Sequence, residues 1–396
     1  MKSQSGVHLG FLFLSIATKS INIFPSGMPQ VSDFILVLGI LVYIFQNRGV
    51  IYLQEEHKQH IKRMAGIVLY QFMMNFIWYH ILDNSALLTK SMYYVFNLLS
   101  FAYVLVLFNE YGYYRLQNTF VAGILSSAIL SMLGVFLVGG QRLRRTGFFN
   151  NPNQLGYFAI IIVAFAFFVF PDIRKKLIVI VLSAVMVIMS GSKAALIGMA
   201  VFALLYGLFY KSYTSSSIFR RFVILGGGFI LLYLLLFSRN ERIISNSLIM
   251  NLRYRFLNLE SDDYLWEGRG YERIAEVGMH FIWGLGEGGF DRFTVMHGVE
   301  SHSAYVTIFV SYGLIGLIGY CYIFKKSIGS SIDKIRHSLI GLSGILLYNA
   351  SHNGIRNTLV WMLLAMLYIM NSTPNYQDDF EINQNENNKV RMSYIK

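Results

Sequence analysis

Cysteine, proline and charged residues are all scarce in this chain of 396 residues. The single cysteine, Cys321, excludes an intrachain disulfide and any zinc site built on cysteines. Only 14% of the residues are charged, whereas a soluble domain usually has about 25%. With only five prolines, long uninterrupted helices can form. These shortages exclude a disulfide-stapled secreted fold, a disordered chain and a two-domain soluble enzyme.

Long apolar runs dominate what remains, with 55% hydrophobic residues and a mean hydropathy of +0.49. About 20 apolar residues span a bilayer as a helix, and in lipid every backbone polar group needs an internal partner. We therefore predict an all-α, polytopic integral membrane protein in which residues 1–371 form a single transmembrane domain of about twelve helices. The predicted spans are 7–24, 31–46, 63–82, 91–109, 119–140, 155–171, 177–192, 194–210, 221–238, 302–324, 337–352 and 355–371.

Lysine and arginine determine the predicted orientation, because short cytoplasmic loops collect these residues. With a cytoplasmic N-terminus, the inner segments contain nineteen of the thirty-three basic residues, including almost every one in a short loop. Both termini are then cytoplasmic, and residues 239–301 form one large periplasmic loop between helices 9 and 10. The tail 372–396 is rich in Asn and Gln, and we expect it to be disordered. We attribute the net charge of +12 to lysine and arginine collected in the cytoplasmic loops, and we do not expect a nucleic-acid partner.

The large loop contains seven arginines and no lysine. Arginine presents a planar fork that binds phosphate through two hydrogen bonds, which lysine cannot do. An alternative is that these arginines pair with the ten acidic residues of the same loop. That alternative explains less well the basic cluster at 142–145, which has no acid nearby. The glycine-rich run 284–289 lacks the ending of a nucleotide-binding loop, and we predict a turn there.

Three predicted outer segments carry motifs: Arg144–Gly156, Ser190–Leu196, and Arg269 through His302 to Gly316. Together they resemble the O-antigen ligase and polymerase superfamily of bacterial envelope biogenesis. The resemblance implies a twelve-span protein of the bacterial inner membrane with its active site at the periplasmic face. It implies transfer of a glycan from an undecaprenyl diphosphate carrier to a hydroxyl acceptor, with no cofactor and no metal.

The resemblance also implies roles for individual residues. Arg145, Arg269 and Arg273 match basic positions of the family, and Lys193 stands where the family more often has arginine. His302 opens the span after the long loop, as the family's histidine does, although Ser303 replaces the asparagine that often follows. We expect His302 and Arg269 to be catalytic, and Arg145, Lys193 and Arg273 to bind the diphosphate.

The chemistry of the residues agrees with these roles. A diphosphate leaving group is stabilised by preorganised cations, and the attacking sugar hydroxyl needs a base. His302 suits the base because an unperturbed histidine titrates near neutrality. Glu300 is an alternative base or an orienting partner, and a plain interfacial histidine at a helix start is the alternative for His302. Glu300, Tyr305 and Trp266 are candidate sugar contacts.

Polymerase is the preferred function: the growing lipid-linked chain is joined to a new lipid-linked repeat unit, and undecaprenyl diphosphate is released. The first alternative is an O-antigen ligase that transfers the lipid-linked glycan to lipid A-core. The second is a lipid-linked oligosaccharide transporter, which would need charges inside the spans to line a path. Expected partners are the lipid-linked donor and acceptor, membrane lipid and, from the resemblance alone, a chain-length regulator.

Overall fold

A computed structural model describes residues 6–24, 29–138, 144–209, 270–294 and 300–372, together with residues 250, 253 and 298. These residues are mostly helical and contain no strand, which confirms the all-α prediction for the described part of the chain. The longer helices are α1 (Val7–Ala17), α2 (Val31–Gln46), α3 (Glu55–Leu82), α4 (Ala86–Leu137), α5 (Pro152–Val169), α6 (Ile173–Ser190), α7 (Lys193–Phe209), α12 (Ala304–Ile328), α13 (Ile332–Ser351) and α14 (Thr358–Ser372). Short helical turns, α11 (Arg273–Glu276), η3 (Gly278–Phe281) and η4 (Phe290–Arg292), precede α12.

Four of the described helices, α3, α4, α5 and α12, are long and apolar enough to cross a membrane. Helices α1, α2, α7 and α14 are apolar but shorter. The span predicted at 221–238, most of the predicted loop 239–301 and residues 373–396 lie outside the described residues.

Several helices differ from the predicted spans. Helix α3 begins at Glu55 instead of residue 63, and α13 begins at Ile332 instead of residue 337. Helix α4 covers both 91–109 and 119–140, and Gly112 interrupts it with a φ of 75° and a ψ of 168°. Glycine adopts this backbone conformation without steric cost, so the two halves change direction with only one residue leaving helical geometry. Helix α1 ends at Ala17 instead of continuing to residue 24, and the chain beyond it bonds to Gln30 at the start of α2.

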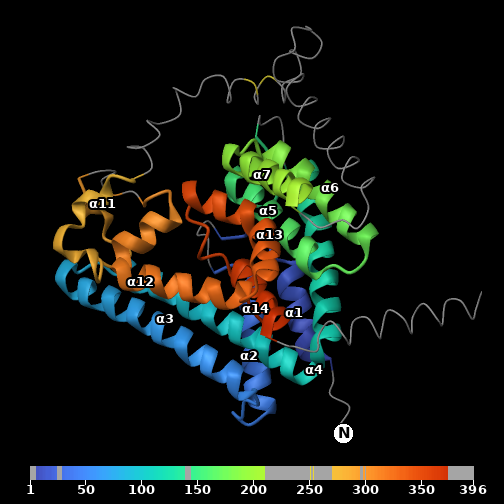
Figure 1. The fold of residues 1–396 in the computed structure, drawn as a ribbon, viewed down its shortest axis with the longest axis horizontal. Helices are drawn as coiled ribbons and strands as arrows, with labels where there is room; N and C mark the ends of the chain where they lie inside the picture. Colours follow the sequence, from blue (N-terminus) through green and yellow to red (C-terminus); the bar gives the residue numbers. More distant parts are fainter. Residues whose placement is uncertain are drawn as a thin grey trace, which may run out of the picture.

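Helices α5 and α14 form the centre of the bundle (Figure 1). Every residue of α5 from Leu155 to Val169 is buried, and so is every residue of α14 from Thr358 to Ile369. Helix α4 contacts α1, α3 and α14, while α7 packs against α13 and α5. Because α5 and α14 are buried on all sides over these stretches, they mark the core, and the polar residues just before each of them lie at its end.

Candidate functional site

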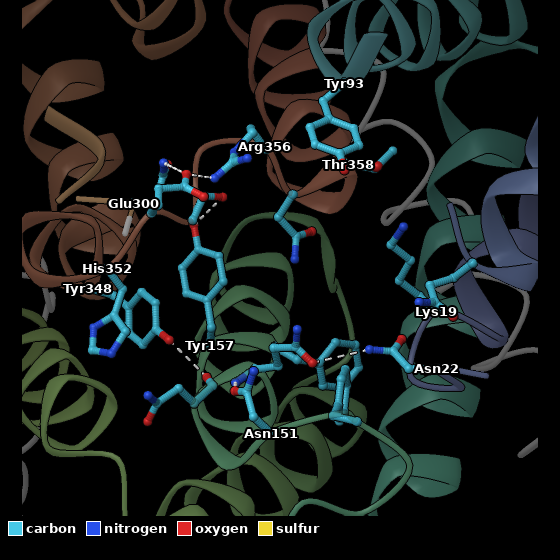
Figure 2. A pocket seen from close by; sticks show the side chains of 18 of the residues that line it. Lys19, Asn22, Tyr93, Asn151, Tyr157, Glu300, Tyr348, His352, Arg356 and Thr358 are labelled. Carbon is cyan, nitrogen blue, oxygen red and sulfur yellow. Dashed lines mark hydrogen bonds and ion pairs between the residues drawn. The ribbon is translucent and has the colours of Figure 1, made fainter. Parts of the chain in front are cut away.

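A polar cavity of about 490 Å³ lies where seven helix ends meet. The ends of α1 and α13 and the starts of α2, α4, α5, α12 and α14 surround it, and they contribute Lys19, His352, Gln30, Lys90, Asn151, His302 and Thr358 respectively. Figure 2 shows Glu300 and Arg356 on one side of this cavity, with Lys19 and Asn22 on the opposite side. Its size and its converging polar groups are typical of a small-molecule or oligosaccharide site.

Glu300 is the centre of an ion network on one wall. Its Oε2 lies 3.1 Å from the Nζ of Lys90, and its Oε1 accepts hydrogen bonds from Arg356 Nη2 and from Asn353 Nδ2, the latter at 2.7 Å. The Nε of Arg356 also lies 3.5 Å from Oε1 of the buried Glu287. Two cations from separate elements are thus held at the cavity by carboxylates.

A second ion pair lies on the opposite wall. Lys19 Nζ is 2.5 Å from Asp33 Oδ1, and the other oxygen of Asp33 accepts from the backbone N–H of Gln30 at 2.8 Å. The Gln30 side chain in turn accepts from the backbone of Ile23 and Phe24. This capping arrangement explains why the chain turns between α1 and α2 and leaves Lys19 in the cavity.

Amide side chains and aromatic rings form most of the remaining lining. The rings of Tyr157 and Tyr348 stack with centroids 4.2 Å apart, and Tyr348 stacks on His352 at 4.5 Å. The Tyr348 hydroxyl donates to the carbonyl of Asn153 at 2.9 Å. Asn151 caps α5 by accepting from the N–H of Gln154 at 2.9 Å. Amides offer both donors and acceptors, and ring faces offer flat apolar area, which are the contacts that sugars require.

The predicted base, His302, is exposed and lines this cavity. Its ring centroid lies 6.4 Å from that of His352. Ser303, which follows it, is 1% exposed and caps α12 by accepting from the N–H of Val306. Ser303 therefore has a structural role that fixes the start of the helix and, with it, the place of His302.

Other predicted residues do not line the cavity. The Arg273 side chain is 1% exposed, with its guanidinium carbon 4.7 Å from the ring centroid of Phe293 and 5.4 Å from that of Phe290. Burial lowers the pKa of Arg273. Burial, and to a smaller extent repulsion by Arg273, also lowers the pKa of nearby Arg292 to about 10. The described structure therefore places Arg273 in an aromatic cluster of the loop.

Arg145, Lys193 and Tyr305 are also outside the cavity lining. The backbone N–H of Arg145 donates to the carbonyl of Met189, and Lys193 is the first residue of α7. The Tyr305 hydroxyl donates to the Leu346 carbonyl at 2.8 Å, in the bundle. The neighbouring Arg144 comes nearer, because its Nη2 donates to Oδ1 of the cavity residue Asn153 at 2.7 Å. Arg269 and Trp266 lie outside the described residues.

The structure therefore places His302 and Glu300 in one cavity with Lys90, Arg356 and Lys19. None of these three basic residues belongs to the motifs of the sequence analysis. Lys90 and Arg356 are basic residues on the predicted outer side, and that placement is the sequence signal that points to them. Lys19 stands near the end of a predicted span, where a charge is unusual. Tyr157 and Asn353 carry no comparable signal in the sequence.

The arrangement can bind an anionic, hydroxyl-rich ligand. An anion entering the cavity would compete with Glu300 for Lys90 and Arg356, and the exposed ring of His302 lines the same cavity. Within the described ranges, no group of three or more His, Cys, Asp or Glu side chains has the geometry to hold a metal ion. Comparison with models of known protein families finds no match to this chain, and comparison with curated proteins also finds none.

Proposed function

We propose that this chain is an O-antigen polymerase, a membrane glycosyltransferase that joins undecaprenyl-diphosphate-linked repeat units at the periplasmic face of the bacterial inner membrane. The observation that carries the proposal is the cavity itself. It joins the expected base, His302, to two cations and a wall of amides and tyrosines at one end of an apolar helix bundle. Its lining suits a glycan attached to a diphosphate.

The orientation of the bundle supports a periplasmic site. All seven helix ends at the cavity are ends that the lysine and arginine distribution assigns to the outer side. The opposite ends also meet one another: Arg63 near the start of α3 donates to the Tyr322 hydroxyl near the end of α12, and Lys334 near the start of α13 donates to the Asn371 carbonyl near the end of α14. A twelve-span arrangement with both termini in the cytoplasm gives this separation of the basic inner ends from the cavity.

In the proposed reaction, His302 accepts the proton of the acceptor hydroxyl as its oxygen attacks the anomeric carbon of the donor. The bond between that carbon and the diphosphate oxygen breaks, and undecaprenyl diphosphate leaves with the electron pair. Arg356 and Lys90 stabilise the charge that develops on the leaving oxygen. Direct displacement inverts the anomeric centre. Glu300 balances these cations before the substrate arrives.

The test is reconstitution of the purified protein in vesicles with undecaprenyl-diphosphate-linked repeat units. We expect longer lipid-linked chains and free undecaprenyl diphosphate with wild type, and at least about a hundredfold slower formation of both with His302→Ala. His80→Ala, which removes an exposed histidine of α3 away from the cavity, is the matched control and should remain active. Absence of chain growth in wild type would contradict the proposal.

Two further arms of this experiment test the alternatives. Transfer only to added lipid A-core would identify a ligase. Movement of the lipid-linked unit across the vesicle membrane without a covalent change would identify a transporter. In cells, deletion should leave a single repeat unit on the lipid A-core if the protein is a polymerase.

A further inference from the structure

A short segment before α12, residues 282–287, enters a break in that helix. Gly313 interrupts α12 with a φ of 62°, and a Cβ placed there would lie 2.3 Å from the carbonyl oxygen of Ile282. The backbone groups freed by the break bond to the segment: Leu285 N–H to Val310 C=O at 2.9 Å, Gly286 N–H to Ser311 C=O at 2.7 Å, and Ile315 N–H to Ile282 C=O at 3.1 Å. The segment is therefore anchored among the helices rather than lying over them.

The segment ends at Glu287, whose side chain is fully buried. Its Oε2 accepts hydrogen bonds from the hydroxyls of Tyr94 at 2.6 Å and Tyr312 at 3.0 Å. Its backbone N–H donates to Oδ1 of Asn75 at 2.6 Å. The carboxylate is thus held by α4 and α12, and the backbone of the same residue by α3.

The other oxygen of Glu287 faces the cavity wall. Oε1 has no hydrogen bond, but it lies 3.5 Å from the Nε of Arg356. The neighbouring Nη2 on the same edge of the guanidinium contacts Glu300, whose side chain is 27% exposed against 0% for Glu287. Arg356 therefore contacts both an inner carboxylate that is sealed from solvent and an outer one that a ligand can reach.

We propose that Glu287 is a positioning residue that holds Arg356 at the cavity wall when the substrate displaces Glu300. A guanidinium with only the outer partner would lose its orientation once an anionic ligand took that partner's place. With Glu287 still at its Nε, the guanidinium keeps Nη2 in the place where the ligand replaces Glu300. The segment 282–287 thereby connects the predicted periplasmic loop to the site. This inference rests on the proposed function for its kinetic test but not for its chemical test.

The kinetic test is a double-mutant cycle in the reconstituted polymerase. Glu287→Gln keeps an acceptor for the two tyrosine hydroxyls and replaces the oxygen that faces Arg356 by an uncharged NH₂ group, while Arg356→Lys removes the Nε that faces it. We expect each single variant to raise KM for the lipid-linked donor on the order of tenfold. The KM of the double variant should exceed that of either single variant by less than about twofold, as expected for directly coupled residues. Independent, multiplying effects would overturn the proposal.

The control variant is Tyr70→Phe. The Tyr70 hydroxyl donates to the carbonyls of Trp283 at 2.7 Å and Tyr312 at 3.1 Å, so its loss loosens the same segment without touching Glu287. This variant should lower the unfolding midpoint and leave the donor KM within about twofold of wild type. An equal rise in KM in Tyr70→Phe would show that Glu287 acts only as an anchor and would overturn the proposal.

The chemical test does not depend on activity. Phenylglyoxal modifies accessible guanidinium groups, and mass spectrometry can follow the rate at Arg356 in the purified full-length protein. We expect a several-fold faster reaction at Arg356 in Glu287→Gln and no change in Tyr70→Phe. Faster labelling in a protein without polymerase activity would support the positioning role while the proposed function fails. An unchanged rate in Glu287→Gln would overturn the positioning role whatever the activity.

Discussion

Replacement of Glu300 by Gln should destabilise the substrate-free protein and strengthen its response to diphosphate. The carboxylate of Glu300 contacts the cations Lys90 and Arg356 and accepts a hydrogen bond from Asn353. Glutamine keeps the length of the side chain but turns an NH₂ group toward at least one of these donors. Arg356 retains Glu287, whereas Lys90 forms no other ion pair within the part of the chain that the structure describes.

The magnitude follows from burial. The side chains of Glu300, Lys90 and Arg356 are 27%, 18% and 14% exposed, which places the network between a surface pair and a sealed one. Exposed pairs contribute about 0–1 kcal/mol, and breaking a buried pair costs about 3–5 kcal/mol. We therefore expect Glu300→Gln to lower the free energy of unfolding by about 1–3 kcal/mol, the usual cost of leaving a buried donor without its acceptor.

Diphosphate should stabilise the Glu300→Gln variant more than it stabilises wild type, although the variant is less stable without ligand. In wild type, a diphosphate has to displace Glu300 from the two cations, but in the variant Lys90 has no carboxylate to lose. Ligand that binds the folded state raises stability in proportion to the logarithm of its concentration over Kd. At the same concentration of undecaprenyl diphosphate, the unfolding midpoint should rise further in Glu300→Gln than in wild type.

The assay is thermal unfolding of the purified protein in detergent, with and without undecaprenyl diphosphate. Asp333→Asn is the matched control, because it makes the same chemical change in the ion pair with Arg336, where the two side chains are 69% and 40% exposed. It should cost less than about 1 kcal/mol and leave the ligand response unchanged. The reasoning is refuted if Glu300→Gln is no more destabilising than this control, or if diphosphate stabilises it less than wild type.

Four further predictions concern catalysis, packing, topology and metal dependence. His302→Ala should reduce turnover about 10²–10⁴-fold, the usual share of a general base, with binding of undecaprenyl diphosphate little changed; loss of binding with normal single-turnover rates would reverse that role. Gly313→Ala should destabilise by at least about 1–3 kcal/mol, because the φ of 62° is strained for alanine and the Cβ would meet the Ile282 carbonyl, whereas Gly66→Ala, with no atom within 4 Å, should be neutral or stabilising in the same unfolding assay. Reporter fusions after Lys176 should report cytoplasm and fusions near Asn258 should report periplasm; a periplasmic signal at Lys176 would overturn the orientation. Activity in the vesicle assay should survive excess chelator, and a loss that magnesium or manganese restores would contradict a metal-independent reaction.

The sequence by itself determined the class of structure. Apolar runs of bilayer length predict helices, because a helix satisfies all of its backbone hydrogen bonds within a single segment, whereas an open strand does not. The bounds of α2, Val31–Gln46, are those of the predicted span 31–46. The distribution of lysine and arginine also assigned Lys90 and Arg356 to the predicted outer side, although neither belongs to a motif.

The tertiary structure decided which charged residues share a cavity. Periodicity reports which residues are apolar, but it does not report which helix ends meet, since that depends on the packing of helices far apart in the chain. The contact of Glu300 with both Lys90 and Arg356 joins residues more than fifty positions apart. Arg273 shows the converse, since a basic residue of the predicted loop packs against aromatic rings instead of lining the cavity.

The break in α12 was likewise beyond the sequence pattern. The glycine-rich run 284–289 predicted only a turn, and Gly313 stands in an apolar run that reads as one continuous helix. Only the folded chain brings the two together, because the carbonyls of Val310 and Ser311 need partners where the helix is interrupted and the backbone of Leu285 and Gly286 supplies them. That local exchange of hydrogen bonds places the buried Glu287 beside Arg356, and no linear pattern of residue types encodes it.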